Sequence, residues 1–113
     1  MPTAREAHRI ETHPEERRVQ VRINGVTVAD STRALALTEG NLPTRWYLPR
    51  EDISAELEPS EHRTTCPFKG EATHFSIGGE DAVAWSYGEP IEQVSAIRDL
   101  VAFYDERVDL KLD

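Results

Sequence analysis

An Asn-Gly pair between two alternating runs is the feature that most constrains the fold of this chain. Apolar residues occupy every second position over residues 19–23 and again at Val26 and Val28, and Asn24-Gly25 separates the two runs. Such alternation buries one face of a strand, and Asn-Gly is the pair that best fits a two-residue β-hairpin turn. The sequence therefore predicts a β-hairpin here.

The same period of two recurs along most of the chain. Further strands are predicted at about residues 35–37, 45–48, 51–57, 72–77, 82–87, 101–103 and 108–112. The 51–57 segment also contains helix formers, but its apolar residues alternate, so we expect a strand followed by a polar loop over 58–63. The pattern is typical of a mainly antiparallel β domain of roughly seven to nine short strands.

One segment departs from this period. Pro90 suits the first turn of a helix, and Ile91, Val94 and Ile97 follow at helical spacing. The sequence predicts one helix over about 90–99.

Length and patterning predict one domain. The chain has 113 residues, which is enough for a single compact unit. Residues 1–16 are polar without a clear period, so we expect a loosely ordered arm there and one β domain over 17–113.

Charge and composition narrow the class of partner and the location. The net charge of −8 repels phosphate backbones, which argues against nucleic-acid binding. We expect no membrane span, because no apolar stretch approaches the necessary length. A single cysteine and a polar N-terminus without a secretory pattern favour a cytoplasmic protein. No pattern predicts an oligomeric state.

The stretch "TTCPFKG", residues 64–70, contains the only cysteine and one of two lysines. Strands are predicted on both sides, so Cys66 to Gly70 forms a hairpin corner, and turn chemistry explains Pro67 and Gly70. Cys66 is either a reactive thiol or, as we favour, a small buried side chain. One cysteine and four scattered histidines do not make a zinc set, so no metal or cofactor is predicted.

Turn chemistry leaves Lys69 unexplained, and this suggests an anion site. Arg33 and Arg50 also lie near strand ends, and arginine and lysine suit carboxylate or phosphate. The alternative is that each cation pairs with a neighbouring acid. The predicted ligand-binding residues are Arg33, Tyr47, Arg50, Cys66, Lys69 and Tyr87, with the pocket near the 64–70 hairpin.

Five motifs occur together: "VADSTRALAL", "WYLPREDI", "TTCPFKGEATHFSI", "AWSYGEPIEQVSAI" and "VAFYDERVD". Together they resemble the domain-of-unknown-function family 427 (DUF427) over about residues 17–113. The resemblance implies a compact fold similar to the β-tent folds of type B methionine sulfoxide reductases. Those relatives often hold zinc through Cys-x-x-Cys knuckles, which this chain lacks, so their metal does not carry over.

Three functions therefore stay open. The first is a domain that binds a small anionic ligand, and the second is a non-catalytic interaction or structural module. The third is a nucleotidyltransferase-like enzyme, a label that the family sometimes carries. That chemistry resembles a Gly-Ser turn followed by an Asp-x-Asp pair. Here Glu51-Asp52 are adjacent and face opposite ways on a strand, which argues against it.

Overall fold

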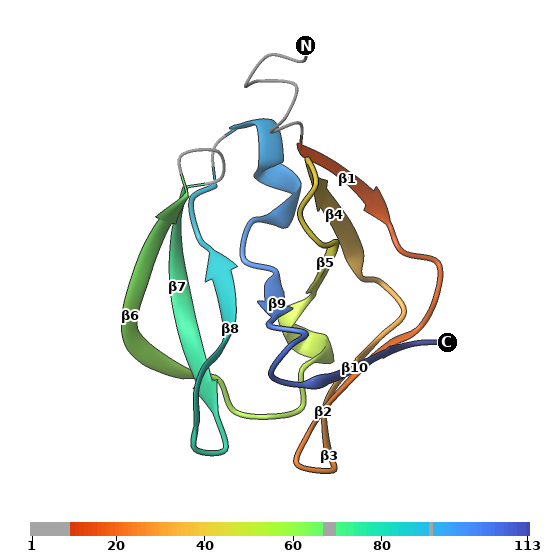
Figure 1. Cartoon of the computed structure of the whole chain (residues 1–113), viewed down its shortest axis with the longest axis vertical. Helices are drawn as coiled ribbons and strands as arrows, with labels where there is room; N and C mark the ends of the chain where they lie inside the picture. The colour runs from red at the N-terminus through yellow and green to blue at the C-terminus, as the bar shows by residue number, and fades with distance from the viewer. Residues whose placement is uncertain (1–9, 67–69, 91) are drawn as a thin grey trace.

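A computed structural model describes residues 10–66, 70–90 and 92–113. The described residues are mainly β and form ten strands and two short 3₁₀ helices (Figure 1). The strands are β1 (Ile10–Pro14), β2 (Val19–Ile23), β3 (Val26–Ser31), β4 (Leu35–Glu39), β5 (Arg45–Leu48), β6 (Glu58–Cys66), β7 (Gly70–Ile77), β8 (Glu80–Tyr87), β9 (Val101–Phe103) and β10 (Asp109–Leu112). The helices are η1 (Arg50–Asp52) and η2 (Glu92–Ile97). No helix among the described residues is long and apolar enough to cross a bilayer.

The strands form two antiparallel sheets. The larger has seven strands in the order β1-β4-β5-β9-β8-β7-β6, and the smaller has the order β10-β2-β3. In Figure 1 the larger sheet runs from β6 at the left, past β9 in the middle, to β1 at the right. Its two halves join where β5 pairs with β9, which places Tyr47 opposite Ala102.

Buried side chains lie on both faces of the larger sheet. One cluster packs Val19 and Val21 of β2 against Leu48 and Phe103, and so joins the two sheets. A second cluster contains Tyr47, Trp85 and Tyr87. Neighbouring residues of a strand point to opposite faces, so β5 contributes Tyr47 to one cluster and Leu48 to the other. The middle of the sheet is therefore covered on both sides, and the face that carries Tyr47 holds the candidate site.

The predicted hairpin is confirmed. Strands β2 and β3 pair with Ile23 opposite Val26, and the turn residues Asn24 and Gly25 have φ values of 52° and 80°. A type I′ turn requires positive φ at both positions, and Asn and Gly tolerate it best. The strands predicted near 35–37, 45–48, 72–77, 82–87, 101–103 and 108–112 are also present.

The helix predicted over 90–99 is wrong. The segment instead contains the 3₁₀ helix η2, which ends at Ile97. The chain stays tightly wound after it, because Arg98 N–H donates to Ser95 O and Leu100 N–H to Ile97 O, both three residues back. A 3₁₀ helix rises about 2.0 Å per residue against 1.5 Å for an α-helix. This longer rise suits a short connection that must reach β9 at Val101 while it buries Ile97.

The sequence also misplaces the strand before the hairpin corner. Residues 51–57 are not a strand: η1 covers 50–52, and Ile53 makes only an isolated bridge to Ala29. Residues 58–63, expected as a loop, belong to the nine-residue strand β6. Because β6 is an edge strand of the larger sheet, its described side chains are largely exposed, and a polar composition suits such a strand.

Part of the expected N-terminal arm is a strand. Ile10–Pro14 forms β1 and pairs along its whole length with β4. Its Ile10 packs against the cluster that contains Tyr47 and Trp85. A partner strand therefore orders this polar segment, although its sequence shows no clear period.

Candidate functional site

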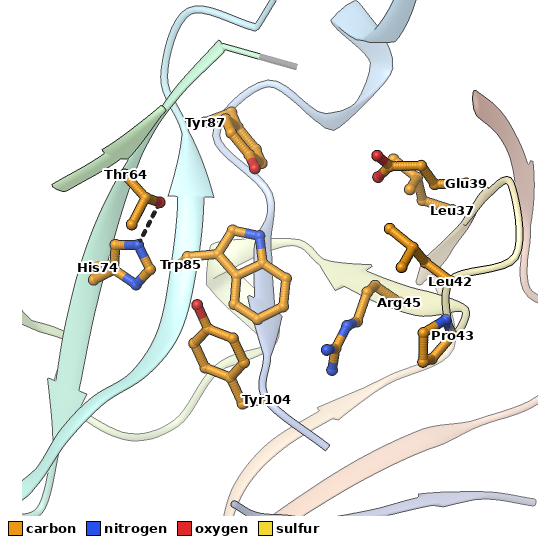
Figure 2. A pocket seen from close by; sticks show the side chains of 10 residues that line it. All are labelled: Leu37, Glu39, Leu42, Pro43, Arg45, Thr64, His74, Trp85, Tyr87 and Tyr104. Atoms are coloured by element: carbon orange, nitrogen blue, oxygen red, sulfur yellow. Dashed lines mark hydrogen bonds between the residues drawn. The ribbon is translucent and has the colours of Figure 1, made fainter. Parts of the chain in front are cut away.

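The face of the larger sheet that carries Tyr47 contains a cavity of about 220 Å³. Figure 2 shows Trp85 in its wall, with Thr64 and His74 on one side and Arg45 on the other. The lining residues are Leu37, Glu39, Leu42, Pro43, Arg45, Thr64, His74, Trp85, Tyr87 and Tyr104.

Strand register explains why these side chains meet. Trp85 of β8 lies opposite His74 of β7 and opposite Ala102 of β9. Residues directly opposite each other on paired strands share a face of the sheet. On the other half of the sheet Leu37 lies opposite Arg45, and Arg45 lies two residues before Tyr47 on β5. These three side chains therefore lie on the same face of the sheet. The site is therefore a row of cross-strand neighbours drawn from five strands.

Two aromatic rings, those of Trp85 and Tyr104, pack together in the wall of the cavity. The centroids of the Trp85 and Tyr104 rings lie 4.4 Å apart, with their planes tilted by 45°. Trp85 Nε1–H donates a 3.1 Å hydrogen bond to the hydroxyl of Tyr47, and these two rings meet edge to face. Tyr47 is fully buried, so it fixes the orientation of the indole from behind.

Arg45 lies over these two rings. Its Cζ atom is 5.4 Å from the centroid of Trp85 and 5.7 Å from that of Tyr104, which is cation–π geometry. The guanidinium binds Glu106 end-on, with Nη1 and Nη2 at 3.1 and 3.4 Å from the two carboxylate oxygens. The hydrogen bond from Arg45 lowers the pKa of Glu106. The Glu106 side chain is 59% exposed, whereas that of Arg45 is 21% exposed.

Asp105 is a second acid beside Arg45. Burial raises the pKa of Asp105, and the nearby Arg45 charge opposes that effect. Its Oδ1 lies 3.7 Å from Arg45 Nη1 and accepts no hydrogen bond from any described residue. Burial also raises the pKa of Tyr104. Both groups are only partly buried, so water still reaches this side of the site.

A histidine and a threonine form the opposite wall. His74 is 4% exposed, and its Nε2 lies 2.9 Å from the hydroxyl oxygen of Thr64. The imidazole stacks on Tyr104, with centroids 6.2 Å apart and an interplanar angle of 11°. The stacking and the hydrogen bond hold the imidazole in one orientation.

The six sequence-predicted site residues do not all meet at this cavity. Tyr87 lines it, and Tyr47 lies behind Trp85. Arg33 and Arg50 do not line it. Arg33 Nη2 contacts Glu51 and Asp52 at 3.2 and 3.0 Å, which raises the pKa of the guanidinium.

Arg50 has a different environment. Its Nε donates to the carbonyl oxygen of Asp99 at 3.2 Å, and its Cζ lies 5.1 Å from the centroid of Phe75. Cys66 ends β6 opposite Gly70, so the strands on either side of the predicted corner pair antiparallel, while corner residues 67–69 lie outside the described residues. Lys69 lies outside the described residues, so its predicted role stays a prediction. The lining residue Thr64 lies two positions before Cys66, on the strand that leads into this hairpin.

Sequence reasoning missed Arg45, Thr64, His74 and Tyr104 as site residues. For Arg45 a signal existed: it lies two positions before Tyr47 in a short aromatic strand, and alternation places both on one face. The signal was weak, because nothing in the sequence showed that β9 and β8 would extend this face. Among the residues that the structure describes, no three His, Cys, Asp or Glu side chains cluster as a metal site would require.

Comparison with known proteins identifies the family. No curated protein matches the chain. The family model described as a domain of unknown function, DUF427, matches residues 11–113, which begins inside β1 and continues to the last residue. This agrees with the resemblance carried by the sequence motifs. The chain therefore belongs to the DUF427 family.

Proposed function

We propose that the domain binds a small anionic ligand in the cavity beside Trp85, and that Arg45 is the group that holds the anion. The observation that carries this proposal is the end-on pair between Arg45 and Glu106. The guanidinium is already positioned to bind a carboxylate with both outer nitrogens. The ligand acid takes the place of Glu106.

Exchange of one carboxylate for another costs little at this position. An ion pair with a partner as exposed as Glu106 contributes about 0–1 kcal/mol. The ring faces of Trp85 and Tyr104 hold the guanidinium in place after Glu106 leaves. A ligand carboxylate therefore meets an arginine whose orientation is fixed in advance.

The remaining walls favour a flat ligand. Trp85, Tyr87 and Tyr104 present ring surface to the cavity, together with Leu37. A volume of about 220 Å³ suits one small ring rather than an extended molecule. Aromatic monocarboxylates such as benzoate and indole-3-acetate are the simplest molecules that combine a ring with one acid.

Tryptophan fluorescence provides a direct test. The chain has two tryptophans, and Trp46 Nε1–H donates to Glu15, away from the cavity, so Trp46→Phe leaves Trp85 as the reporter. We expect benzoate and indole-3-acetate to change the Trp85 emission saturably, and their neutral amides to bind at least tenfold more weakly. Thermal melting with the same compounds gives an independent measurement of binding.

Variants of the ion pair sharpen the test. Arg45→Gln removes the anion partner and should abolish the preference for acid over amide. Glu106→Gln removes the competing carboxylate and should tighten acid binding about 1.5- to 5-fold. Arg63→Gln is the matched control, since Arg63 pairs with Glu71 on an exposed surface outside the cavity. The proposal fails if amides bind as well as acids, or if a folded Arg45→Gln protein keeps the preference.

A further inference from the structure

A second cavity of about 400 Å³ adjoins the first. Three residues line both cavities: Thr64, His74 and Tyr104. The second cavity is completed by Ala82, Glu106 and Arg107. The hydrogen-bonded and stacked groups around His74 therefore lie between two adjoining hollows.

Arg107 is fixed at the edge of the second cavity by main-chain groups. Its Nη1 donates to the carbonyl oxygens of Asp81 and Ala82 at 2.7 and 3.4 Å. Ala82 has a φ of 52°, a left-handed conformation that alanine rarely adopts, and its N–H donates to Ser76 Oγ at 3.1 Å. Strained backbone of this kind persists only where neighbours hold it. Arg107 and Ser76 supply those contacts from opposite ends of the residue.

The guanidinium of Arg107 keeps donors for a ligand. Its Nε and Nη2 atoms make no hydrogen bond with any described residue. No carboxylate of a described residue forms an ion pair with Arg107. Without ligand, Glu106, the acid in the wall of the same cavity, is bound to Arg45. The ligand acid displaces it, so the freed Glu106 carboxylate then competes with the second acidic group for Arg107. A fixed arginine without an acid partner attracts an anionic group.

We propose that the second cavity takes a second acidic group of the same ligand, so that the ligand is an elongated dianion. This inference rests on the proposed function. The ring and first acid occupy the cavity at Arg45, a spacer passes Thr64 and His74, and a carboxylate or phosphate reaches Arg107. The Thr64 hydroxyl, which lines both hollows, offers a hydrogen bond to a polar atom of the spacer.

Neighbouring acids limit the expected gain in affinity. Glu80 and Asp109 border a polar hollow that Arg107 also lines. Their charge offsets part of the attraction between Arg107 and an anion. We therefore expect a dianion of the right length to bind about tenfold more tightly than benzoate, rather than several orders of magnitude.

The test uses benzoates that carry a second carboxylate on a para chain of one to five methylene groups. Affinities are measured from Trp85 emission in the Trp46→Phe protein. One spacer length should give the tenfold gain over benzoate, and its half-ester should lose it. A probe of that length with a phosphate end distinguishes phosphate from carboxylate recognition, and a gain with either supports the proposal.

Two variants of Arg107 test whether this residue binds the second acidic group of the ligand. Arg107→Gln should remove the gain for the dianion and leave benzoate binding unchanged, whereas Arg107→Lys keeps a positive charge and should retain part of the gain. Arg63→Gln is again the control. The inference is overturned if no spacer length gives a gain while benzoate still binds, or if the gain survives in a folded Arg107→Gln protein. If benzoate itself does not bind, the proposed function fails as well.

Discussion

At the scale of single residues, the pair between Tyr47 and Trp85 shows how the site depends on buried hydrogen bonds. The Tyr47 hydroxyl accepts from the indole N–H, and both side chains are at least 94% buried. Tyr47→Phe leaves that N–H without its partner in an apolar environment. We expect the free energy of unfolding to fall by about 1–3 kcal/mol, measured by urea denaturation.

A matched control separates this effect from the loss of a hydroxyl in general. The hydroxyl of Tyr104 makes no hydrogen bond with described residues, so Tyr104→Phe should change the free energy of unfolding by less than about 0.5 kcal/mol. Equal costs for the two substitutions would contradict the structural role given to Tyr47.

The pKa of Glu15 links the pH dependence of the free energy of unfolding to one side-chain network. Hydrogen bonds from Arg17 and then from Trp46 lower the pKa of Glu15 from 4.5 to about 2. A carboxyl whose pKa is lower in the folded protein stabilises the fold above pH 4.5, and this contribution disappears as the pH falls towards 2.

Glu15→Gln should therefore reduce stability at pH 6–7, and the difference from the wild type should shrink as the pH falls from about 5 to 2. Urea denaturation across that range measures it. The exposed neighbour Glu16 provides the control, and Glu16→Gln should match the wild type in stability at pH 6–7. A deficit for Glu15→Gln that stays constant with pH would contradict the network.

Residue types alone indicated which side chains could line a pocket, and their role in binding stays a prediction. Tyr87 was selected because it lies at a strand end next to Gly88 and Pro90, and it lines the cavity. The same reasoning selected Arg33 because it lies near a turn, but could not show that Asp52 would lie 3.0 Å from it. Whether a cation is paired depends on folding between distant segments, which single-sequence patterns do not contain.

At the scale of elements, the local turn signal was reliable, whereas the helical spacing over 90–99 and the alternation over 51–57 were not. The Asn24-Gly25 turn was predictable because two adjacent residues determine it. The polar strand β6 was not, because its stability comes from pairing with β7 rather than from its own composition. The same holds for β1, which β4 orders.

The hairpin turn also gives a test with an internal control. Gly25 has a φ of 80° and open space around its Cα, so Gly25→Ala adds backbone strain without a clash. We expect a loss of about 1–2 kcal/mol in the free energy of unfolding. At Gly88 an added Cβ meets only Asp99 Oδ1 at 3.8 Å and φ is not positive, so Gly88→Ala should change stability little. Similar losses at both positions would argue against a conformational cause.

At the scale of the whole molecule, strand order decides where the site forms. Strands β5 and β9 are far apart in sequence, yet their pairing joins two halves of one sheet and brings Arg45 next to Trp85. Periodicity predicts which face of a strand is buried, but not which strand lies beside it. The antiparallel β class was therefore predictable, whereas the cavity was not.

The position of β1 leads to a prediction about the whole domain. Strand β1 covers the edge of β4, and Ile10 packs on the cluster behind the cavity. A chain that starts at residue 17 lacks this strand, so β4 becomes an open edge and Leu35 and Leu37 lose cover. Open apolar edges pair with other chains.

We expect the truncated chain to melt more than about 5 °C below the full chain and to self-associate in size-exclusion chromatography. His13→Gln, an exposed change that keeps β1, should melt like the wild type. A truncated chain that stays monomeric, melts at the wild-type temperature and still binds benzoate would contradict this role of β1 and favour the loosely ordered arm that the sequence predicted over residues 1–16.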